Sequence, residues 1–120
     1  VLVTSRDGLD EVSLSAPTSI RIVRGDEYES SEWVPDDFGL GHVSIQEIQA
    51  SGPHESATMI RRVLQGEHGP ARSIVLANAA AALWAAEAVP NLRNGVEAAD
   101  QSIRSGRALA ILDALTTLTE

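Results

Sequence analysis

The spacing of apolar residues changes once along the chain, and this change limits what the chain can fold into. In the first 50 residues, short apolar and β-branched runs such as residues 1–3 and 19–23 alternate with turn residues, which is typical of strands. After residue 53, apolar residues recur every three or four positions, the pattern of amphipathic helices. The sequence therefore predicts an α/β fold made of a strand, a hairpin and then about four helices.

The hairpin is predicted over residues 19–34, where two strand-like segments flank Gly25 and Asp26. Glycine and aspartate favour the tight turn that joins antiparallel strands. We expect one side of the hairpin to be covered by Tyr28, Trp33 and Val34. We expect the other side to face water with the acidic residues Glu27, Glu29 and Glu32, a solvated surface.

Helices are predicted over residues 55–65, 70–89, 91–105 and from 107 to the end. Gly66 stands at a stop position, Pro70 opens the second helix, and Asn91 is a suitable N-cap for the third. Ser44 and Glu47 have the spacing of a capping box, which predicts a short helical turn near residues 44–49. The four alanines at 79–82 permit close approach of another element. Asn78 either bonds a neighbouring backbone or contacts a ligand, and we favour the backbone.

Composition excludes several function classes. The chain has 120 residues, 43% of them hydrophobic, with 17 acidic and 9 basic residues and a formal net charge of -8. This length suits one modest core, and the acidic balance disfavours binding to nucleic acid or to an anionic membrane. The absence of cysteine fits a reducing compartment. The most apolar stretch, residues 75–86, is too short to cross a bilayer, so we expect a soluble, cytoplasmic protein.

An acidic stretch, Asp7 to Glu11, directly follows the apolar run at residues 1–3. Such a run is typical of a buried strand, and ligands of α/β sheets collect beyond the carboxyl ends of strands. The adjacent carboxylates of Asp10 and Glu11 suit Mg²⁺, which takes one or two protein carboxylates together with water and phosphate oxygens. Gly8 allows a sharp turn before them. The alternative is an exposed acidic turn without a ligand.

The histidines and serines suggest no further chemistry. His42, His54 and His68 flank glycine or proline breaks and lack the mutual spacing of a zinc site. The serines at 13, 15 and 19 have no nearby base in sequence, so a nucleophilic triad is unsupported. We therefore assign no catalytic residue within this chain, and only Asp10 and Glu11 as metal ligands.

A series of short motifs resembles the closing third of anthranilate phosphoribosyltransferase, in the same order and at similar intervals. These motifs are Asp7 to Ser13, Pro17 and Thr18, Asp37 to Gly39, Gly69 to Arg72, Val75 to Leu83, Gly95 to Glu97, and Ser105 with Gly106. One departure is that Thr4 and Ser5 stand where the family often has His-Gly. The resemblance implies that residues 1–120 are the C-terminal portion of one mixed-sheet α/β catalytic domain. The N-terminal helical domain and the glycine-rich phosphate loop are expected to precede Val1, which lies inside a predicted strand.

The resemblance also implies a function. The family transfers phosphoribosyl from phosphoribosyl pyrophosphate to anthranilate in tryptophan biosynthesis, with Mg²⁺ as cofactor and usually as a homodimer. By position, Asp10 and Glu11 match its acidic metal ligands, Glu11 touching both ions and Asp10 one of them. The remaining substrate contacts of the family lie upstream, so this chain alone is expected to be inactive. Two alternatives stay open: a non-catalytic acidic helical binding module, and an enzyme related to the nucleoside phosphorylases.

Overall fold

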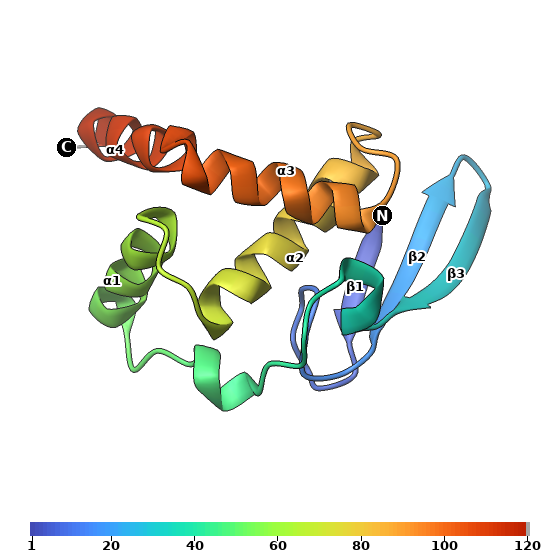
Figure 1. Cartoon of the computed structure of the whole chain (residues 1–120). Coiled ribbons are helices and arrows are strands. Elements are labelled where there is room, and N and C mark those ends of the chain that lie inside the picture. The colour runs from blue at the N-terminus through green and yellow to red at the C-terminus, as the bar shows by residue number, and fades with distance from the viewer. Residues whose placement is uncertain (120) are drawn as a thin grey trace.

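The computed structural model describes residues 1–119 and confirms the α/β class, with a small sheet and four α-helices (Figure 1). The strands are β1 (Leu2–Ser5), β2 (Thr18–Arg24) and β3 (Glu27–Trp33). Two short 3₁₀ helices follow, η1 (Pro35–Phe38) and η2 (Ile45–Ile48), and then α1 (Pro53–Leu64), α2 (Pro70–Ala85), α3 (Leu92–Arg104) and α4 (Arg107–Thr119). This element order is the one predicted from the sequence. No helix in the described part of the chain is both long and apolar enough to cross a membrane.

The sheet is antiparallel throughout the described residues, in the order β1-β2-β3. Leu2 pairs with Arg21 in the first ladder, and Arg24 pairs with Glu27 across the predicted turn. Gly25 in this turn has a φ of 61°, a conformation that glycine adopts without steric cost. The predicted hairpin is therefore confirmed. Within the described residues β1 pairs along one edge only and Leu2 is 63% exposed, so the first strand is not buried in this chain.

The hairpin of β2 and β3 projects away from the helices (Figure 1), and its buried residues, Thr18 and Ile20, lie in the first half of β2. Trp33, at the end of β3, meets Phe38 edge to face at 5.7 Å and Trp84 of α2 at 5.3 Å between ring centroids. Tyr28 is 69% exposed, so the expectation that it covers one side is wrong. Its ring instead lies 6.0 Å from the guanidinium carbon of Arg21, a cation–π pair at the surface.

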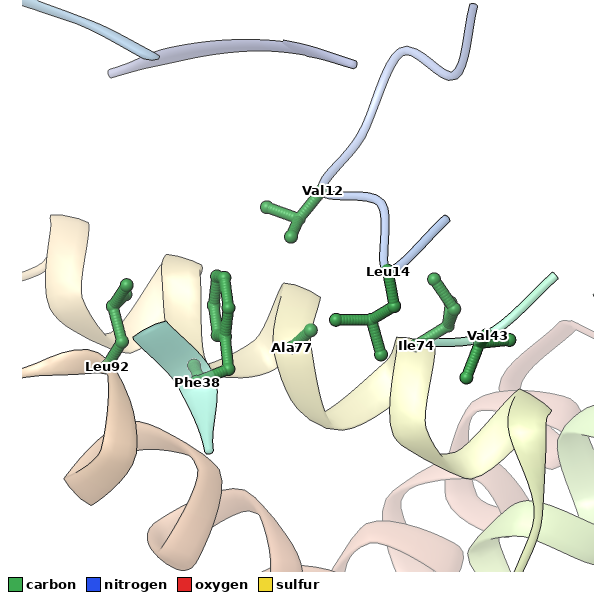
Figure 2. Packing of buried hydrophobic residues seen from close by; sticks show 8 residues of the cluster. Val12, Leu14, Phe38, Val43, Ile74, Ala77 and Leu92 are labelled. Carbon is green, nitrogen blue, oxygen red and sulfur yellow. The ribbon is translucent and has the colours of Figure 1, made fainter. Parts of the chain in front are cut away.

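Helix α2 lies at the centre of the molecule, between the strand segment and α3 (Figure 1). Its Ala77 and Ala80 are completely buried, as expected for small residues at close contacts. One cluster of buried side chains, which includes Val12 and Leu14, joins α2 to the loop after β1, and Leu14 points at the helix between Ala77 and Ile74 (Figure 2). A second cluster joins α1, α2 and α3 through Val63, Leu76, Ala99 and Ile103.

Local signals predicted most helix ends, but α1 begins at Pro53, two residues before the predicted start, because proline fits the first helical turn. The Asn91 side chain accepts the amide of Asn94 at 2.9 Å, and the Glu47 carboxylate accepts the amide of Ser44 at 2.9 Å, as their capping patterns predicted. Helix α2, however, ends at Ala85 and not at residue 89. Glu87 takes a left-handed conformation with a φ of 57°, and the amides of 87 and 88 bond the carbonyls of 84 and 83. This is a Schellman ending formed without its usual glycine.

Candidate functional site

The acidic stretch lies in the loop between β1 and β2, and backbone hydrogen bonds close this loop on itself. The Ser5 amide donates to the Leu9 carbonyl at 3.0 Å, and the Arg6 amide donates to the Pro17 carbonyl at 3.0 Å. Gly8 has a φ of 96° and no atom within 4 Å of where its side chain would begin. The turn therefore requires glycine for its backbone conformation and not for lack of space. The structure confirms that Asp10 and Glu11 follow a strand.

Asp7 holds the two halves of this loop together. Its carboxylate accepts the Leu9 amide at 3.2 Å, which is an Asx turn, and the Ser13 hydroxyl at 2.5 Å. Burial pushes the pKa of Asp7 upward, but hydrogen bonds involving Ser13, Ser5 and the Leu9 amide outweigh burial and hold this pKa below its ordinary value. This role of Asp7 was not predicted from the sequence. An aspartate two residues before a loop amide was the available signal.

Ser13 and Thr18 complete the inner side of the loop. The Ser13 amide donates to the Thr18 hydroxyl at 3.0 Å, and the Ser13 hydroxyl accepts the Ser15 amide at 2.9 Å. Both side chains are buried, at 1% and 0% exposure. Ser13 is therefore part of the loop scaffold, since its hydroxyl and its amide both serve neighbouring groups.

Asn78 of α2 fixes the loop from outside. Its Oδ1 accepts the Val12 amide at 2.9 Å, and its Nδ2 donates to the Val12 carbonyl at 3.0 Å and to the Ile74 carbonyl at 3.1 Å. One side chain thus satisfies both backbone groups of a residue that is 1% exposed. The backbone interpretation of Asn78 is confirmed.

Asp10 and Glu11 lie between the fixed residues Leu9 and Val12. Asp10 is exposed and Glu11 is half-buried. Partial burial raises the pKa of Glu11, and the adjacent charge of Asp10 raises it further. Within residues 1–119, neither carboxylate accepts a hydrogen bond or pairs with an arginine. Two neighbouring carboxylates without a protein partner are suited to bind a cation.

The three histidines were expected in loops; His42 and His68 lie outside helices and strands, whereas His54 lies in the first turn of α1. His42, His54 and His68 are exposed and lie far apart along the chain. Over the described range 1–119, no group of three or more histidine, cysteine or acidic side chains converges as a metal cluster would. A two-carboxylate site is compatible with this result, because Mg²⁺ takes few protein ligands.

Comparison with known proteins gives the chain a family. The sequence pattern described as "Glycosyl transferase family, a/b domain" matches residues 1–109. The anthranilate phosphoribosyltransferase of Acidovorax sp. (strain JS42) is 42% identical over 120 residues, which are 100% of this chain and 35% of that protein. The enzyme of that name from Symbiobacterium thermophilum is 43% identical over 119 residues, 99% of this chain and 35% of its own length.

Solved structures agree with the sequence comparison. Anthranilate phosphoribosyltransferase from Saccharomyces cerevisiae, in complex with PRPP and Mg, superposes with a TM-score of 0.82 at 29% identity, covering 92% of this chain and 32% of that one. The enzyme from Thermus thermophilus gives a TM-score of 0.80 at 31% identity, over 93% and 33% of the two chains. The chain spans about a third of the length of the curated relatives it matches. The match of the family pattern over residues 1–109 shows that this chain belongs to the glycosyl transferase family, in its α/β domain.

Proposed function

We propose that this chain is the C-terminal portion of the α/β catalytic domain of an anthranilate phosphoribosyltransferase. The proposal is supported by relatives of that name, 42% and 43% identical over nearly all of the chain. The complete enzyme would add the helical domain and the glycine-rich phosphate loop that the resemblance places before Val1. Its reaction would transfer phosphoribosyl from phosphoribosyl pyrophosphate to anthranilate, a step of tryptophan biosynthesis.

In this reaction the bond between C1 of the ribose and the pyrophosphate oxygen breaks, and its electron pair leaves with pyrophosphate. The lone pair of the anthranilate amine forms the new C1–N bond, and the nitrogen then loses a proton. The products are N-(5'-phosphoribosyl)anthranilate and pyrophosphate. The protein must therefore stabilise negative charge that grows on the leaving pyrophosphate.

Asp10 and Glu11 are proposed as the residues that hold Mg²⁺ for this purpose, with Glu11 contacting two ions and Asp10 one. The observation that carries the proposal is that these adjacent carboxylates have no protein donor among residues 1–119, while Leu9 before them and Val12 after them are held by hydrogen bonds. Burial raises the pKa of Glu11, and repulsion from Asp10 raises it further; a bound cation would oppose both effects. Bound Mg²⁺ would supply positive charge beside the pyrophosphate, and so reconcile a chain of net charge -8 with an anionic substrate.

The test compares Asp10→Asn and Glu11→Gln in a complete enzyme, for example one in which residues 1–120 replace the matching segment of the Acidovorax sp. relative. Each change keeps the shape of the side chain and removes its charge. We expect kcat to fall about 30- to 1000-fold, a loss of roughly 2 to 4 kcal/mol of transition-state stabilisation. The Mg²⁺ concentration for half-maximal rate should rise.

The melting temperature without ligand separates this role from a structural one. Removing one of two repelling charges should leave that temperature unchanged or raise it. A control with the same chemical change, Asp26→Asn in the exposed hairpin turn, should alter neither kinetics nor Mg²⁺ requirement. Unchanged kinetics together with a lower melting temperature for Asp10→Asn and Glu11→Gln would overturn the metal assignment.

A homodimer in the cytoplasm completes the proposal and rests on the family resemblance. Anthranilate and phosphoribosyl pyrophosphate are its substrates, and neither nucleic acid nor membrane is a partner. Sedimentation of the complete enzyme at micromolar concentration should give twice the mass of one chain. A monomer at that concentration, with full activity, would contradict the dimer.

A further inference from the structure

We infer that Asn78 is a positioning residue for Asp10 and Glu11, and not only a structural contact of α2. The inference rests on the proposed metal-binding function of these two carboxylates. It starts from the two hydrogen bonds, 2.9 and 3.0 Å long, by which the Asn78 side chain holds the amide and the carbonyl of Val12. Val12 directly follows Glu11, so the bond to its amide fixes the Glu11–Val12 peptide plane, and the bond to its carbonyl fixes the next peptide plane.

The other end of the acidic pair is fixed independently. The Leu9 amide donates to Asp7 Oδ1 at 3.2 Å, and the Leu9 carbonyl accepts the Ser5 amide at 3.0 Å. Asp10 and Glu11 are the two residues between these anchors. Because adjacent Cα atoms are about 3.8 Å apart and the backbone varies only in φ and ψ, anchors on both sides restrict the directions in which the Cα–Cβ bonds of Asp10 and Glu11 point. Loss of the Val12 anchor would free Glu11 first.

Asn78 is itself held rigidly. Its second N–H donates to the Ile74 carbonyl at 3.1 Å, so every polar atom of the amide is used and its orientation is set. It follows Ala77, which is 0% exposed, and lies two residues before Ala80, also 0% exposed. Asn78 therefore attaches the loop to the most buried segment of α2. Metal ligands held in this way by a second layer of hydrogen bonds bind metal more tightly than free ones.

The experiment measures divalent-ion binding in the complete enzyme for Asn78→Leu and Asn78→Gln. Leucine keeps the approximate size and removes all three hydrogen bonds, whereas glutamine keeps the amide and moves it by one methylene. Binding of Mn²⁺ in the presence of inorganic pyrophosphate is followed by electron paramagnetic resonance of free Mn²⁺. The Mg²⁺ dependence of turnover is measured alongside it.

We expect both variants to weaken Mn²⁺ binding about tenfold or more, with a matching rise in the Mg²⁺ concentration for half-maximal rate. The control is Leu76→Val on the same helix, whose side chain packs in the other cluster, with Val63, Ala99 and Ile103. It lowers the melting temperature through lost packing and should leave Mn²⁺ binding unchanged. If the folded Asn78 variants bind Mn²⁺ as the control does, the positioning role is wrong.

Hydrogen exchange at the Val12 amide of the unsubstituted enzyme tests the same idea without any variant. The amide should be protected before metal is added, and free exchange there would overturn the inference. Asp10→Asn and Glu11→Gln are measured in parallel to separate the two proposals. Normal Mn²⁺ binding in those variants would show that Asp10 and Glu11 are not the metal ligands, and this inference would then be wrong too. If Mn²⁺ binding is weakened in Asp10→Asn and Glu11→Gln but not in the Asn78 variants, only the positioning role of Asn78 is wrong.

Discussion

Gly95 of α3 lies against Ala80 of α2 so closely that a Cβ atom added to the glycine would come within 2.8 Å of the Ala80 Cα. Replacing glycine by alanine inside a helix ordinarily stabilises the helix by up to about 1 kcal/mol. Here the two helices would have to separate.

We expect Gly95→Ala to lower the free energy of unfolding by about 1 to 3 kcal/mol, measured by urea denaturation. Gly41→Ala, where nothing lies within 4 Å, should change it by less than about 0.5 kcal/mol. A gain in stability from Gly95→Ala would mean that α2 and α3 pack more loosely.

The second prediction concerns the buried guanidinium of Arg72 and its partner Asp100. Arg72 is 4% exposed and donates to Asp100 and to the Gly66 carbonyl, at 2.5 and 2.6 Å. We expect Asp100→Ala to lower the free energy of unfolding by about 2 kcal/mol, because a buried charge loses its partner while Asp100 itself is partly solvated. The control is Arg104→Ala, which removes an exposed arginine 3.9 Å from the same carboxylate. It should cost less than about 1 kcal/mol. Equal effects of the two changes would contradict the importance of burial.

Stability around Asp7 should depend on pH. Because folding lowers the pKa of Asp7 from 3.8, its hydrogen bonds stabilise the fold above pH 3.8, and this contribution disappears as pH falls through the folded-state value. We expect Ser13→Ala to lower the free energy of unfolding by about 1 kcal/mol at pH 7. The difference from the unsubstituted chain should shrink in acid, as shown by urea denaturation at pH 7 and pH 3. A difference that grows in acid would show that the hydroxyl does not serve the ionised carboxylate.

The 120-residue chain by itself should not turn over anthranilate. The resemblance places the glycine-rich phosphate loop of the proposed enzyme before Val1, so the chain alone is expected to lack the main anion contact of the substrate. Chromatographic assay of the purified chain with anthranilate, phosphoribosyl pyrophosphate and Mg²⁺ should give no phosphoribosylanthranilate above the uncatalysed background. Turnover that survives in the purified chain and is lost in Glu11→Gln would refute this prediction.

The same chain should self-associate through β1. Leu2 is 63% exposed and the strand pairs on one edge only among the described residues, and an apolar strand with a free edge is a template for pairing. We expect Leu2→Lys to shift the sedimentation of the chain towards monomer. Leu118→Lys makes the same chemical change at an 82% exposed position of α4 and should have little effect. If only Leu118→Lys dissociates the oligomers, the chain self-associates through α4 and the prediction for β1 is wrong.

Much of this fold could be predicted because its signals are local. The Gly25 turn, the Ser44–Glu47 capping pair and the Asn91 cap each act within three residues of themselves, so sequence spacing contains the information. The position of Asp10 and Glu11 after a strand was predictable for the same reason. Their metal-binding role remains a prediction.

What could not be predicted depends on distant or unusual contacts. Asn78 and Val12 are 66 residues apart, and no periodicity relates them. Glu87 ends α2 in a conformation that favours glycine, so the sequence pattern predicted a longer helix. The exposure of Leu2 and Tyr28 follows from where the sheet lies relative to the helices, which is a tertiary property.

The contact between Trp33 and Trp84 makes the intrinsic tryptophan fluorescence of the chain sensitive to its tertiary structure. These are its two tryptophans, one at the base of the hairpin and one on α2, with ring centroids 5.3 Å apart. Indole emission shifts to longer wavelength on exposure to water, so undocking of the sheet from the helices would register as a red shift. Emission from an unlabelled sample would thus follow whether the hairpin base stays joined to α2.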